Sequence, residues 1–323
     1  MLAQDAVSPT IADALAALRA GGLVAMPTET VYGLAADARN PAAVRQIFAA
    51  KGRPADHPLI VHLADATQVE HWARDIPPTA RGLMRAFWPG PLTLILPKAA
   101  AVDPVVTGGQ DSVGLRVPAH PVAQALLSAF GSGLAAPSAN RFGRISPTTA
   151  AHVREEFPDL DLCILDGGAS EVGLESTIVD LSGAAPRLLR PGHIARADIE
   201  ALIGPLQLPA DHEGPRASGR LAAHYAPGKP LDLVPAEALA GYCAEHDEPI
   251  AWLSAGPLPA GCQGLALPSA SAGYAQALYA ALRTLDATTA KRIAVLLPPD
   301  SPDWAAVHDR LRRAAVGGGR HTR

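Results

Sequence analysis

Three features of the sequence predict an α/β fold in two units. Short apolar runs alternate with segments of helical apolar spacing, as expected for strands that alternate with helices. The alternation stops over residues 206–230, which are rich in Pro, Gly and Ala, and then starts again. The 323 residues are 48% hydrophobic and 18% charged, which suits two domains with buried cores. We expect a larger domain at 1–205, a linker or lid at 206–230 and a smaller α/β domain at 231–323.

The first elements have clear end signals. Thr10 is a good N-cap for a helix, and Gly21 stands just past the end of that helix. Residues 23–26 form a short apolar run, typical of a buried strand. Asn40 and Pro41 predict the start of a second helix, because Asn caps helices well and Pro suits the first helical position.

The remaining elements follow from apolar runs and breakers. In the larger unit we expect helices at 66–72, 79–87, 121–130, 147–157 and 197–203. We expect strands at 57–62, 92–96, 113–117, 134–136, 162–165, 176–180 and 187–190, and a polar loop at 98–111 that could close over a ligand. After the linker, strands at 231–234, 250–254 and 293–297 alternate with helices at 236–245, 273–285 and 304–315, which predicts a small parallel sheet.

Composition narrows the function. A net charge of −4 and an aromatic content of 4% argue against a large nucleic-acid surface. Cys163, Cys243 and Cys262 lack zinc spacing, and we interpret them as reduced, buried thiols. The sequence has no charged and apolar leader and no apolar run of membrane-spanning length, so we expect no export, no membrane span and a cytoplasmic location.

Polar side chains gather where the first predicted elements end. They supply hydroxyls, a carboxylate, two cations and two imidazoles: Thr28, Glu29, Thr30, Lys51, Arg53, His57 and His62. Ligands bind at strand ends in open α/β sheets, which favours a binding site here. Each residue alone is equally typical of a solvated loop or, for the cations, of a helix C-terminus. The histidines have no nearby third ligand, so we expect no metal site.

Later segments carry similar groups with the same two interpretations. Residues 137–140 place a hydroxyl and a carboxamide after a strand, as in an anion or sugar site or in a capped turn. Arg116 lies inside an apolar strand and needs an anionic partner if it is buried; Ser112 lies on the same face of that strand. Arg190 precedes a stiff Pro-Gly turn. The chain has no nucleophile elbow, zinc-helix motif or P-loop.

Several motifs in register identify a family resemblance. They are Pro-Thr-Glu-Thr-Val-Tyr-Gly-Leu from Pro27, Lys-x-Arg-Pro from Lys51, Pro-Leu-Ile-Val-His from Pro58, Trp-Pro-Gly-Pro-Leu-Thr from Trp88, Pro-Ser-Ala-Asn from Pro137, Glu-Ser-Thr-Ile from Glu175 and Arg-Pro-Gly from Arg190. In this order they resemble the YrdC-like threonylcarbamoyl-AMP synthases, over residues 10–205. The tail resembles the long form of that family. The resemblance implies a twisted open mixed sheet with flanking helices, and a Rossmann-like C-terminal domain.

The resemblance also implies a reaction. The amine of L-threonine and bicarbonate would give a carbamate, which attacks the α-phosphate of ATP to yield threonylcarbamoyl-AMP and pyrophosphate. ATP would carry Mg²⁺ with it. A downstream transferase complex would pass the threonylcarbamoyl group to adenosine in tRNA, so this chain would bind tRNA weakly or not at all. Phosphoryl chemistry of this kind needs positioning and charge neutralisation more than a protein nucleophile.

The resemblance assigns site residues position by position. The residues that would bind L-threonine are Thr30, His62, Arg116, Ala136 through its backbone, and Ser176. The residues that would bind ATP are Lys51, Arg53, His57, Ser112, Ser138, Asn140, Ser146, Arg190 and Tyr225. Lys51 and Arg53 would meet the triphosphate and serve catalysis. Tyr225 would belong to a linker that folds over the pocket.

The sequence departs from the family pattern at two places, and two alternative functions remain open. Many long forms carry Pro-Gly-Met and basic residues before His-Tyr-Ala-Pro, where this chain has Ala217-Ser218-Gly219-Arg220 and then three apolar residues. Ser112 stands where Thr is common, and keeps the hydroxyl. One alternative is a carbamoyltransferase-type maturation factor, but its acylphosphatase and Cys-rich modules are missing from this sequence. The other is a non-catalytic RNA-binding assembly factor, which the acidic net charge disfavours.

Overall fold

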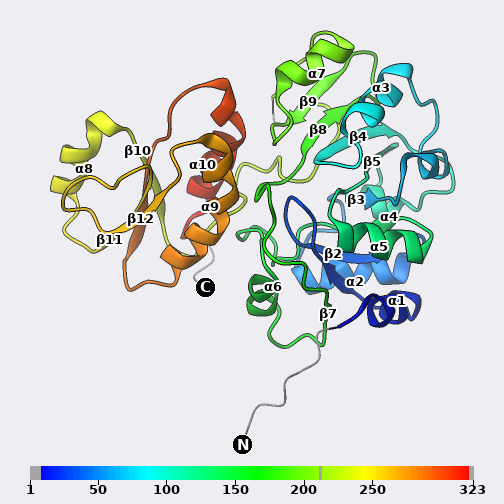
Figure 1. Ribbon diagram of the computed structural model, residues 1–323, viewed down its shortest axis with the longest axis horizontal. Helices are drawn as coiled ribbons and strands as arrows, with labels where there is room; N and C mark the ends of the chain where they lie inside the picture. The colour runs from blue at the N-terminus through cyan, green and yellow to red at the C-terminus, as the bar shows by residue number, and fades with distance from the viewer. Residues whose placement is uncertain (1–8, 211–212, 320–323) are drawn as a thin grey trace, which may run out of the picture.

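A large and a small sheet, each with its own helices, form two lobes (Figure 1). The computed structural model describes residues 9–210 and 213–319. The large sheet has the strand order β7-β1-β2-β6-β3-β5-β4-β8-β9. Its strands are β1 (Val24–Met26), β2 (Gly33–Asp37), β3 (Ile60–His62), β4 (Leu92–Pro97), β5 (Ser112–Arg116), β6 (Leu134–Ala135), β7 (Cys163–Ile164), β8 (Thr177–Asp180) and β9 (Arg187–Arg190).

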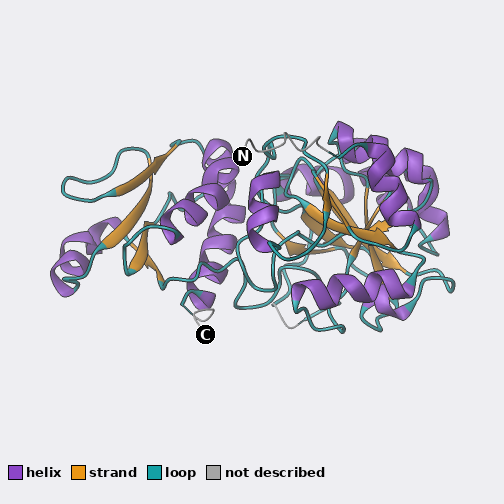
Figure 2. Cartoon of the chain, turned by 90° about the horizontal axis from the view of Figure 1, so that it is seen from below, coloured by secondary structure: helices purple, strands orange, loops and turns teal. Residues whose placement is uncertain are grey.

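The large sheet is mixed. β3 pairs with β5 in parallel and with β6 antiparallel, while β4 pairs antiparallel with β5 and in parallel with β8. Helices cover both sides of the sheet (Figure 2). They are α1 (Ile11–Arg19), α2 (Pro41–Lys51), α3 (Pro78–Phe87), α4 (Pro104–Thr107), α5 (Pro121–Phe130), α6 (Ala150–Glu156) and α7 (Arg196–Ile203), with a 3₁₀ turn at Ala66–His71.

Local sequence signals set the helix ends. Thr10 and Asp13 form a capping box at the start of α1, with the Asp13 carboxylate 2.7 Å from the Thr10 hydroxyl. The Asn40 side chain accepts hydrogen bonds from the backbone N–H groups of Ala42 and Ala43. Gly52 ends α2 in the left-handed conformation at φ +61°. The predicted helix starts at Thr10 and Asn40 are therefore confirmed.

The small sheet is parallel throughout, as predicted, with the order β10-β13-β11-β12. Its strands are β10 (Leu231–Val234), β11 (Ile250–Ala255), β12 (Gly264–Leu267) and β13 (Arg292–Leu296). Its helices are α8 (Leu239–Glu245), α9 (Ser271–Asp286) and α10 (Ala305–Gly317), with 3₁₀ turns at Ala236–Ala238 and Pro302–Trp304. α9 and α10 lie on the side that faces the large domain (Figure 1).

One hydrophobic cluster crosses the boundary between the domains. Val31 and Leu174 of the large domain pack in it with Tyr279 of α9 and Leu311 of α10. Tyr225, between the two sheets in the sequence, is buried in the same cluster. Burial of this shared apolar surface stabilises the contact between the domains.

Several expectations were incomplete. β2 and β12 were not predicted, since Gly33–Asp37 and Gly264–Leu267 are built largely from small residues with no β-branched side chain. Residues 66–71 form a 3₁₀ rather than an α-helix. Cys243 is exposed and Cys163 and Cys262 are half-buried, so the expectation of three buried thiols was wrong; all three cysteines are free.

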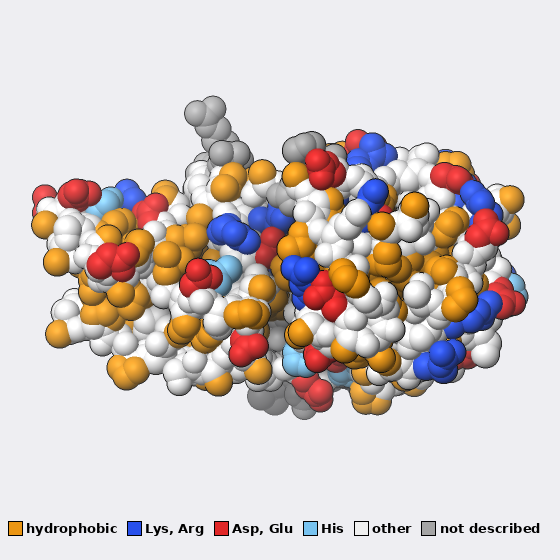
Figure 3. Space-filling model, turned by 90° about the horizontal axis from the view of Figure 1, so that it is seen from above, with side chains coloured by type: hydrophobic (Ala, Val, Ile, Leu, Met, Phe, Trp, Pro, Cys, Tyr) orange, Lys and Arg blue, Asp and Glu red, His pale blue; other side chains and the backbone are white. Residues whose placement is uncertain are grey.

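The charge pattern on the face in Figure 3 is mixed. Lys and Arg side chains gather beside the boundary between the domains, with Asp and Glu side chains among them. A groove of about 1420 Å³ along this boundary has the same character, with Arg196 and Arg312 alongside Asp300 and Asp303. Such a surface lacks the continuous basic stripe expected of a nucleic-acid site. Among the described residues, no helix is long and apolar enough to cross a membrane.

The loop at 98–111 packs against the segment that follows α2. It contains α4, and Gly108 ends that helix at φ +58°. A Cβ atom on Gly108 would lie 2.2 Å from the Asp56 carbonyl oxygen. This close approach packs the loop against the segment carrying Arg53 and His57. Residues 98–111 do not join the lining of the cavity described below, and closure of the loop over a ligand stays a prediction.

Gly108→Ala should therefore destabilise the protein more than Gly109→Ala. Gly109 has a similar φ of +80° but no atom within 4 Å of an added Cβ. We expect the control to lose about 1–2 kcal/mol from backbone strain alone. Gly108→Ala should lose a further 1–3 kcal/mol or so from the clash. Urea denaturation measures both, and equal losses would contradict a tight contact with Asp56.

Candidate functional site

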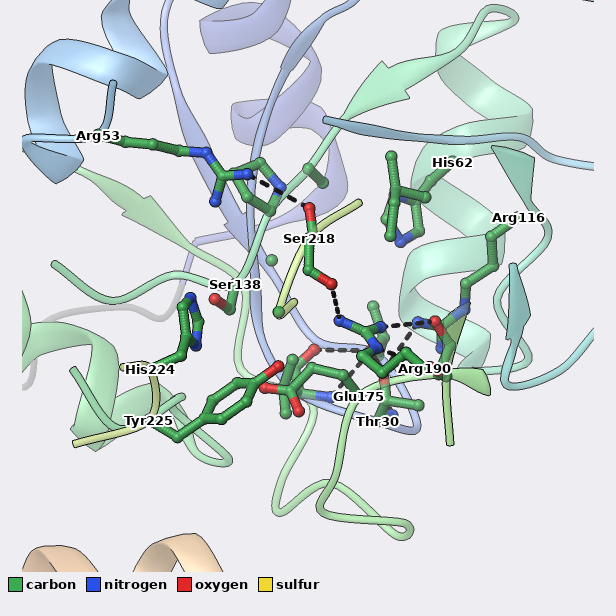
Figure 4. Close-up of a pocket in the computed structure, with 18 residues that line it drawn as sticks. Thr30, Arg53, His62, Arg116, Ser138, Glu175, Arg190, Ser218, His224 and Tyr225 are labelled. Atoms are coloured by element: carbon green, nitrogen blue, oxygen red, sulfur yellow. Dashed lines mark hydrogen bonds between the residues drawn. The ribbon is translucent and has the colours of Figure 1, made fainter. Parts of the chain in front are cut away.

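A cavity of about 50 Å³ lies where the ends of the large-domain strands meet the segment between the domains (Figure 4). Thr30 follows β1, His62 ends β3, Arg116 ends β5 and Arg190 ends β9. The full lining is Thr28, Thr30, Val31, Gly33, Arg53, Ile60, His62, Arg116, Ala136, Pro137, Ser138, Glu175, Ser176, Arg190, Ser218, Gly219, His224 and Tyr225. The structure thus brings together most of the residues singled out in the sequence.

Arg116 is buried and has the anionic partner that its apolar strand demanded. Its Nη2 donates to the Glu29 carboxylate at 2.6 Å, and its Nη1 donates to the Thr30 hydroxyl at 2.9 Å. Among the described residues, its Nε has no hydrogen-bond partner. The two bonds use two of the five N–H donors of the guanidinium, and Nε is the one nitrogen that makes no bond.

His62 lies next to Arg116 and is uncharged. The two residues are direct partners in the β3–β5 register. Burial, followed by the charge of Arg116, lowers the pKa of His62 to about 3. Its Nδ1 has no hydrogen-bond partner. His62 therefore offers the cavity a neutral, polar ring at physiological pH.

Arg190 connects β8 to the segment between the domains. Its Nε and Nη2 donate to the Ser176 carbonyl and hydroxyl at 3.0 and 3.1 Å, and its Nη1 donates to the Ser218 carbonyl at 2.9 Å. The Ser176 hydroxyl also lies 2.7 Å from the Thr93 hydroxyl. Burial lowers the pKa of Arg190, although the side chain remains a cation in the physiological range.

Arg53 lies on the opposite side of the cavity from Arg116 (Figure 4), whereas Lys51 does not join the lining. Lys51 is the last residue of α2 and is 3% exposed. Its ammonium donates to the carbonyl oxygens of Ser138, at 2.6 Å, and Asn140. Burial, with the nearby charge of Arg53, holds the pKa of Lys51 well below its usual value. Arg53 donates to the Pro58 carbonyl and the Ser218 hydroxyl, and burial lowers its pKa to about 10.

The segment between the domains supplies four residues that line the cavity: Ser218, Gly219, His224 and Tyr225. In Figure 4, Ser218 lies between Arg53 and Arg190, with His62 and Arg116 to one side and Ser138, His224 and Tyr225 to the other. Gly219 has φ +80°, and a Cβ there would lie 2.1 Å from the Tyr225 hydroxyl. Tyr225 itself has φ +60° and is 1% exposed, and its hydroxyl has no hydrogen-bond partner among residues 9–210 and 213–319.

Other sequence-predicted residues surround the cavity without lining it. His57 packs edge-on against Phe142, and Asn140 is buried with its side-chain oxygen unpartnered. Ser146 donates to Glu175 at 2.5 Å. Ser112 lines a smaller adjoining cavity of about 20 Å³ with Ser218.

Sequence reasoning missed several lining residues. Glu175 stands in one of the motifs but was given no role, and Ser218 and His224 were interpreted only as parts of the linker. Glu29 does not line the cavity, but it was likewise not identified as the partner of Arg116. The need of each buried arginine for an acceptor was the one signal that pointed to the carboxylates. The described residues contain no group of three or more His, Cys, Asp or Glu side chains that could hold a metal ion.

Both domains match protein-family models. Residues 16–192 match the model of the Sua5, YciO and YrdC proteins, described as "Telomere recombination". Residues 194–316 match the family described as "Threonylcarbamoyl-AMP synthase, C-terminal domain". The chain is 41% identical over 328 residues to the threonylcarbamoyl-AMP synthase of Bacillus subtilis, covering 96% of this chain and 94% of the relative. It is also 48% identical over 222 residues to the Pyrococcus abyssi enzyme, covering 67% of this chain and 65% of the relative.

A solved structure extends this similarity to the whole fold. P. abyssi Sua5 in complex with L-threonine superimposes with a TM-score of 0.89 at 40% identity, covering 95% of this chain and 94% of the other. The expected fold class is confirmed, and the match over both domains favours a nucleotidyltransferase over an RNA-binding factor without catalysis. The chain belongs to the Sua5/YrdC family of threonylcarbamoyl-AMP synthases, in its long two-domain form.

Proposed function

We propose that the cavity condenses L-threonine, bicarbonate and ATP into threonylcarbamoyl-AMP and pyrophosphate. The observation that carries this proposal is the convergence of three buried arginines, Arg53, Arg116 and Arg190, with small hydroxyls at one end of the sheet. Cations held in a dry site suit a reaction at a triphosphate, which requires charge neutralisation. Purified protein supplied with the three substrates should release pyrophosphate and the adenylate together.

L-Threonine would bind on the Arg116 side of the cavity. The free Nε of Arg116 suits the threonine carboxylate, and Thr30 and Ser176 offer hydroxyls to the side chain. The Ala136 amide already donates to the Ile60 carbonyl at 3.0 Å, so Ala136 would contribute its carbonyl oxygen to the substrate amine. Neutral His62 would bond the substrate without repelling the ammonium form of the amine. The solved structure of P. abyssi Sua5 complexed with L-threonine supports L-threonine as the ligand.

ATP would bind on the Arg53 side and along the segment between the domains. Lys51 and Arg53 would neutralise the triphosphate, and Arg190 would bond it after releasing the Ser218 carbonyl. Ser138, Asn140, Ser146, His57, Ser112 and Tyr225 complete the proposed ATP set. Mg²⁺ would arrive with ATP, bound through phosphate oxygens. The carbamate oxygen attacks the α-phosphorus, the bond from that phosphorus to the pyrophosphate oxygen breaks, and pyrophosphate leaves.

The segment at 206–230 would act as a lid, although residues 211–212 lie outside the described residues. A cavity of about 50 Å³ is far below the several hundred Å³ that nucleotide-sized ligands occupy. Ser218 and Tyr225 must therefore move before ATP enters. Closure afterwards would exclude water from the carbamate and the mixed anhydride. The product would pass to a downstream tRNA threonylcarbamoyl transferase, and we propose a cytoplasmic location.

Threonine should stimulate pyrophosphate release well above serine, and valine should fail. A site built to bond a hydroxyl leaves its own polar groups unpaired when valine binds. Pyrophosphate release is measured with each amino acid, and a reaction without bicarbonate is the control. Equal turnover with valine would refute the substrate assignment.

Arg53→Ala and Lys51→Met should each lower turnover by roughly 10²–10³-fold, because each removes a cationic side chain that would neutralise the triphosphate. Lys51 is changed to Met to keep its buried volume, and thermal unfolding of each variant separates lost charge from lost stability. Arg81→Ala is the control, since Arg81 is an exposed arginine on α3 that pairs only with Glu70 in a surface ion pair. Near-normal activity in both variants would contradict this prediction and would mean that the two cations have only a structural role.

Tyr225→Ala should weaken ATP binding, and ATP with threonine should protect the exposed Arg216–Ala217 bond from trypsin. Tyr225→Phe retains the ring that stacks on Tyr279 at 5.7 Å and removes only the unpartnered hydroxyl. Weakening by both variants would mean that the hydroxyl meets ATP; weakening by Ala alone would mean that the ring closes the lid. Equal cleavage with and without saturating ligands would mean that residues 206–230 only dock the second domain.

A further inference from the structure

Glu175 is a buried carboxylate at the wall of the proposed ATP site. It is 7% exposed, lines the cavity and precedes Ser176. One oxygen accepts from the Ser146 hydroxyl at 2.5 Å. The other accepts from the Tyr279 hydroxyl and from Arg310 Nε, both at 2.9 Å. Two of its three side-chain partners therefore belong to the small domain.

Arg310 is held from several sides. Its side chain is 0% exposed, and its Nη1 bonds the Asp309 carboxylate at 2.6 Å. Its Nη2 donates to the Glu175 backbone carbonyl at 3.2 Å. Its guanidinium carbon lies 5.3 Å from the centre of the Tyr225 ring. The Arg310 side chain of α10 thus contacts Glu175 in the wall of the cavity and Tyr225 in the proposed lid.

A buried anion beside a triphosphate site opposes ligand binding unless a cation neutralises it. Glu175 would stand close to the phosphates of ATP, because Ser146 and Arg190 are among its neighbours. We propose that Arg310 is a positioning residue for ATP, supplied by the C-terminal domain, which neutralises Glu175 and keeps its carboxylate turned toward Ser146. This inference rests on the ATP site proposed above.

The groups around Glu175 determine its ionisation. Arg310 and Tyr279 face it from the small domain, Arg190 and Ser146 from the large domain, and Tyr225 from the segment between them; Asp309 lies behind Arg310. Burial alone would raise the pKa of Glu175, but Arg310, then Arg190 and the Ser146 hydrogen bond, outweigh it and hold the pKa below its usual value. Without Arg310, the largest of the opposing effects is lost, and burial should raise this pKa.

The interface offers a matched control for a merely structural ion pair. Arg283 of α9 donates to the Glu156 carboxylate of α6 at 2.9 Å, with side chains 12% and 5% exposed. This pair also joins the domains, but neither residue lines the cavity. If Arg310 only fastened the domains together, Arg310→Met and Arg283→Met would have the same effect on ATP affinity.

The experiment measures ATP dissociation constants, threonine dissociation constants and thermal unfolding for full-length wild type, R310M, R283M and the double variant E175Q/R310M. R310M should weaken ATP binding on the order of tenfold at about pH 8.5, with a smaller effect on threonine. The loss should shrink as the pH is lowered, because burial then favours protonation of Glu175 and the neutral carboxyl ceases to repel ATP. E175Q/R310M should recover most of the affinity, and R283M should lower the unfolding temperature without changing ATP affinity.

Three results would overturn the proposal: unchanged ATP affinity in R310M, equal losses in R310M and R283M, or no recovery in the double variant. If R310M alone fails to fold, the double variant, which has no unpaired charge, is compared directly with R283M, and ATP affinity lower than that of R283M counts against the proposal. Wild-type ATP binding and pyrophosphate release are measured first. Failure there counts against the proposed function, whereas normal ATP binding by R310M counts against this inference alone.

Discussion

The burial of arginine side chains at one end of the large sheet is the constraint on which the site depends. Arg116, Arg190 and Arg310 are each almost fully removed from water, and each lies against carboxylates, carbonyls or hydroxyls. Their acceptors come from distant parts of the chain: Glu29 follows the first strand, Ser176 immediately precedes the eighth, and Ser218 lies between the domains. Removing any acceptor leaves a desolvated charge, so the strand ends, the intervening segment and the C-terminal domain must fold together for the site to exist.

The same constraint accounts for the small cavity. Without ligand, the hydroxyl and carbonyl of Ser218 accept hydrogen bonds from Arg53 and Arg190. Phosphate oxygens are stronger, charged acceptors for the same donors. In the proposed reaction, entry of ATP would therefore exchange one set of acceptors for another without leaving a buried cation unpaired. In the same proposal, the mutual neutralisation of Glu175 and Arg310 would let a carboxylate remain beside the ATP site.

Local sequence signals predicted much of the fold but less of the candidate site. Asn40 and Pro41 correctly predicted the start of α2, because the preference for helix N-caps depends on only a few adjacent residues. The charge of Arg116 within an apolar strand predicted an anionic partner, but sequence spacing could not name Glu29. The contact of Glu175 with Arg310 spans 135 residues and depends on how two domains pack, which no local pattern encodes. β2 escaped prediction because Gly33–Asp37 is buried yet built mostly from small residues.

The origin of the carbonyl carbon in the product tests the central claim most directly. Full-length protein is incubated with ATP, L-threonine and ¹³C-bicarbonate, and the adenylate is analysed by mass spectrometry. We predict an adenylate that carries the label in a carbamoyl group between the threonine nitrogen and the phosphate, and that disappears when bicarbonate is withheld. An unlabelled threonyl-adenylate, formed equally well without bicarbonate, would contradict the proposed reaction.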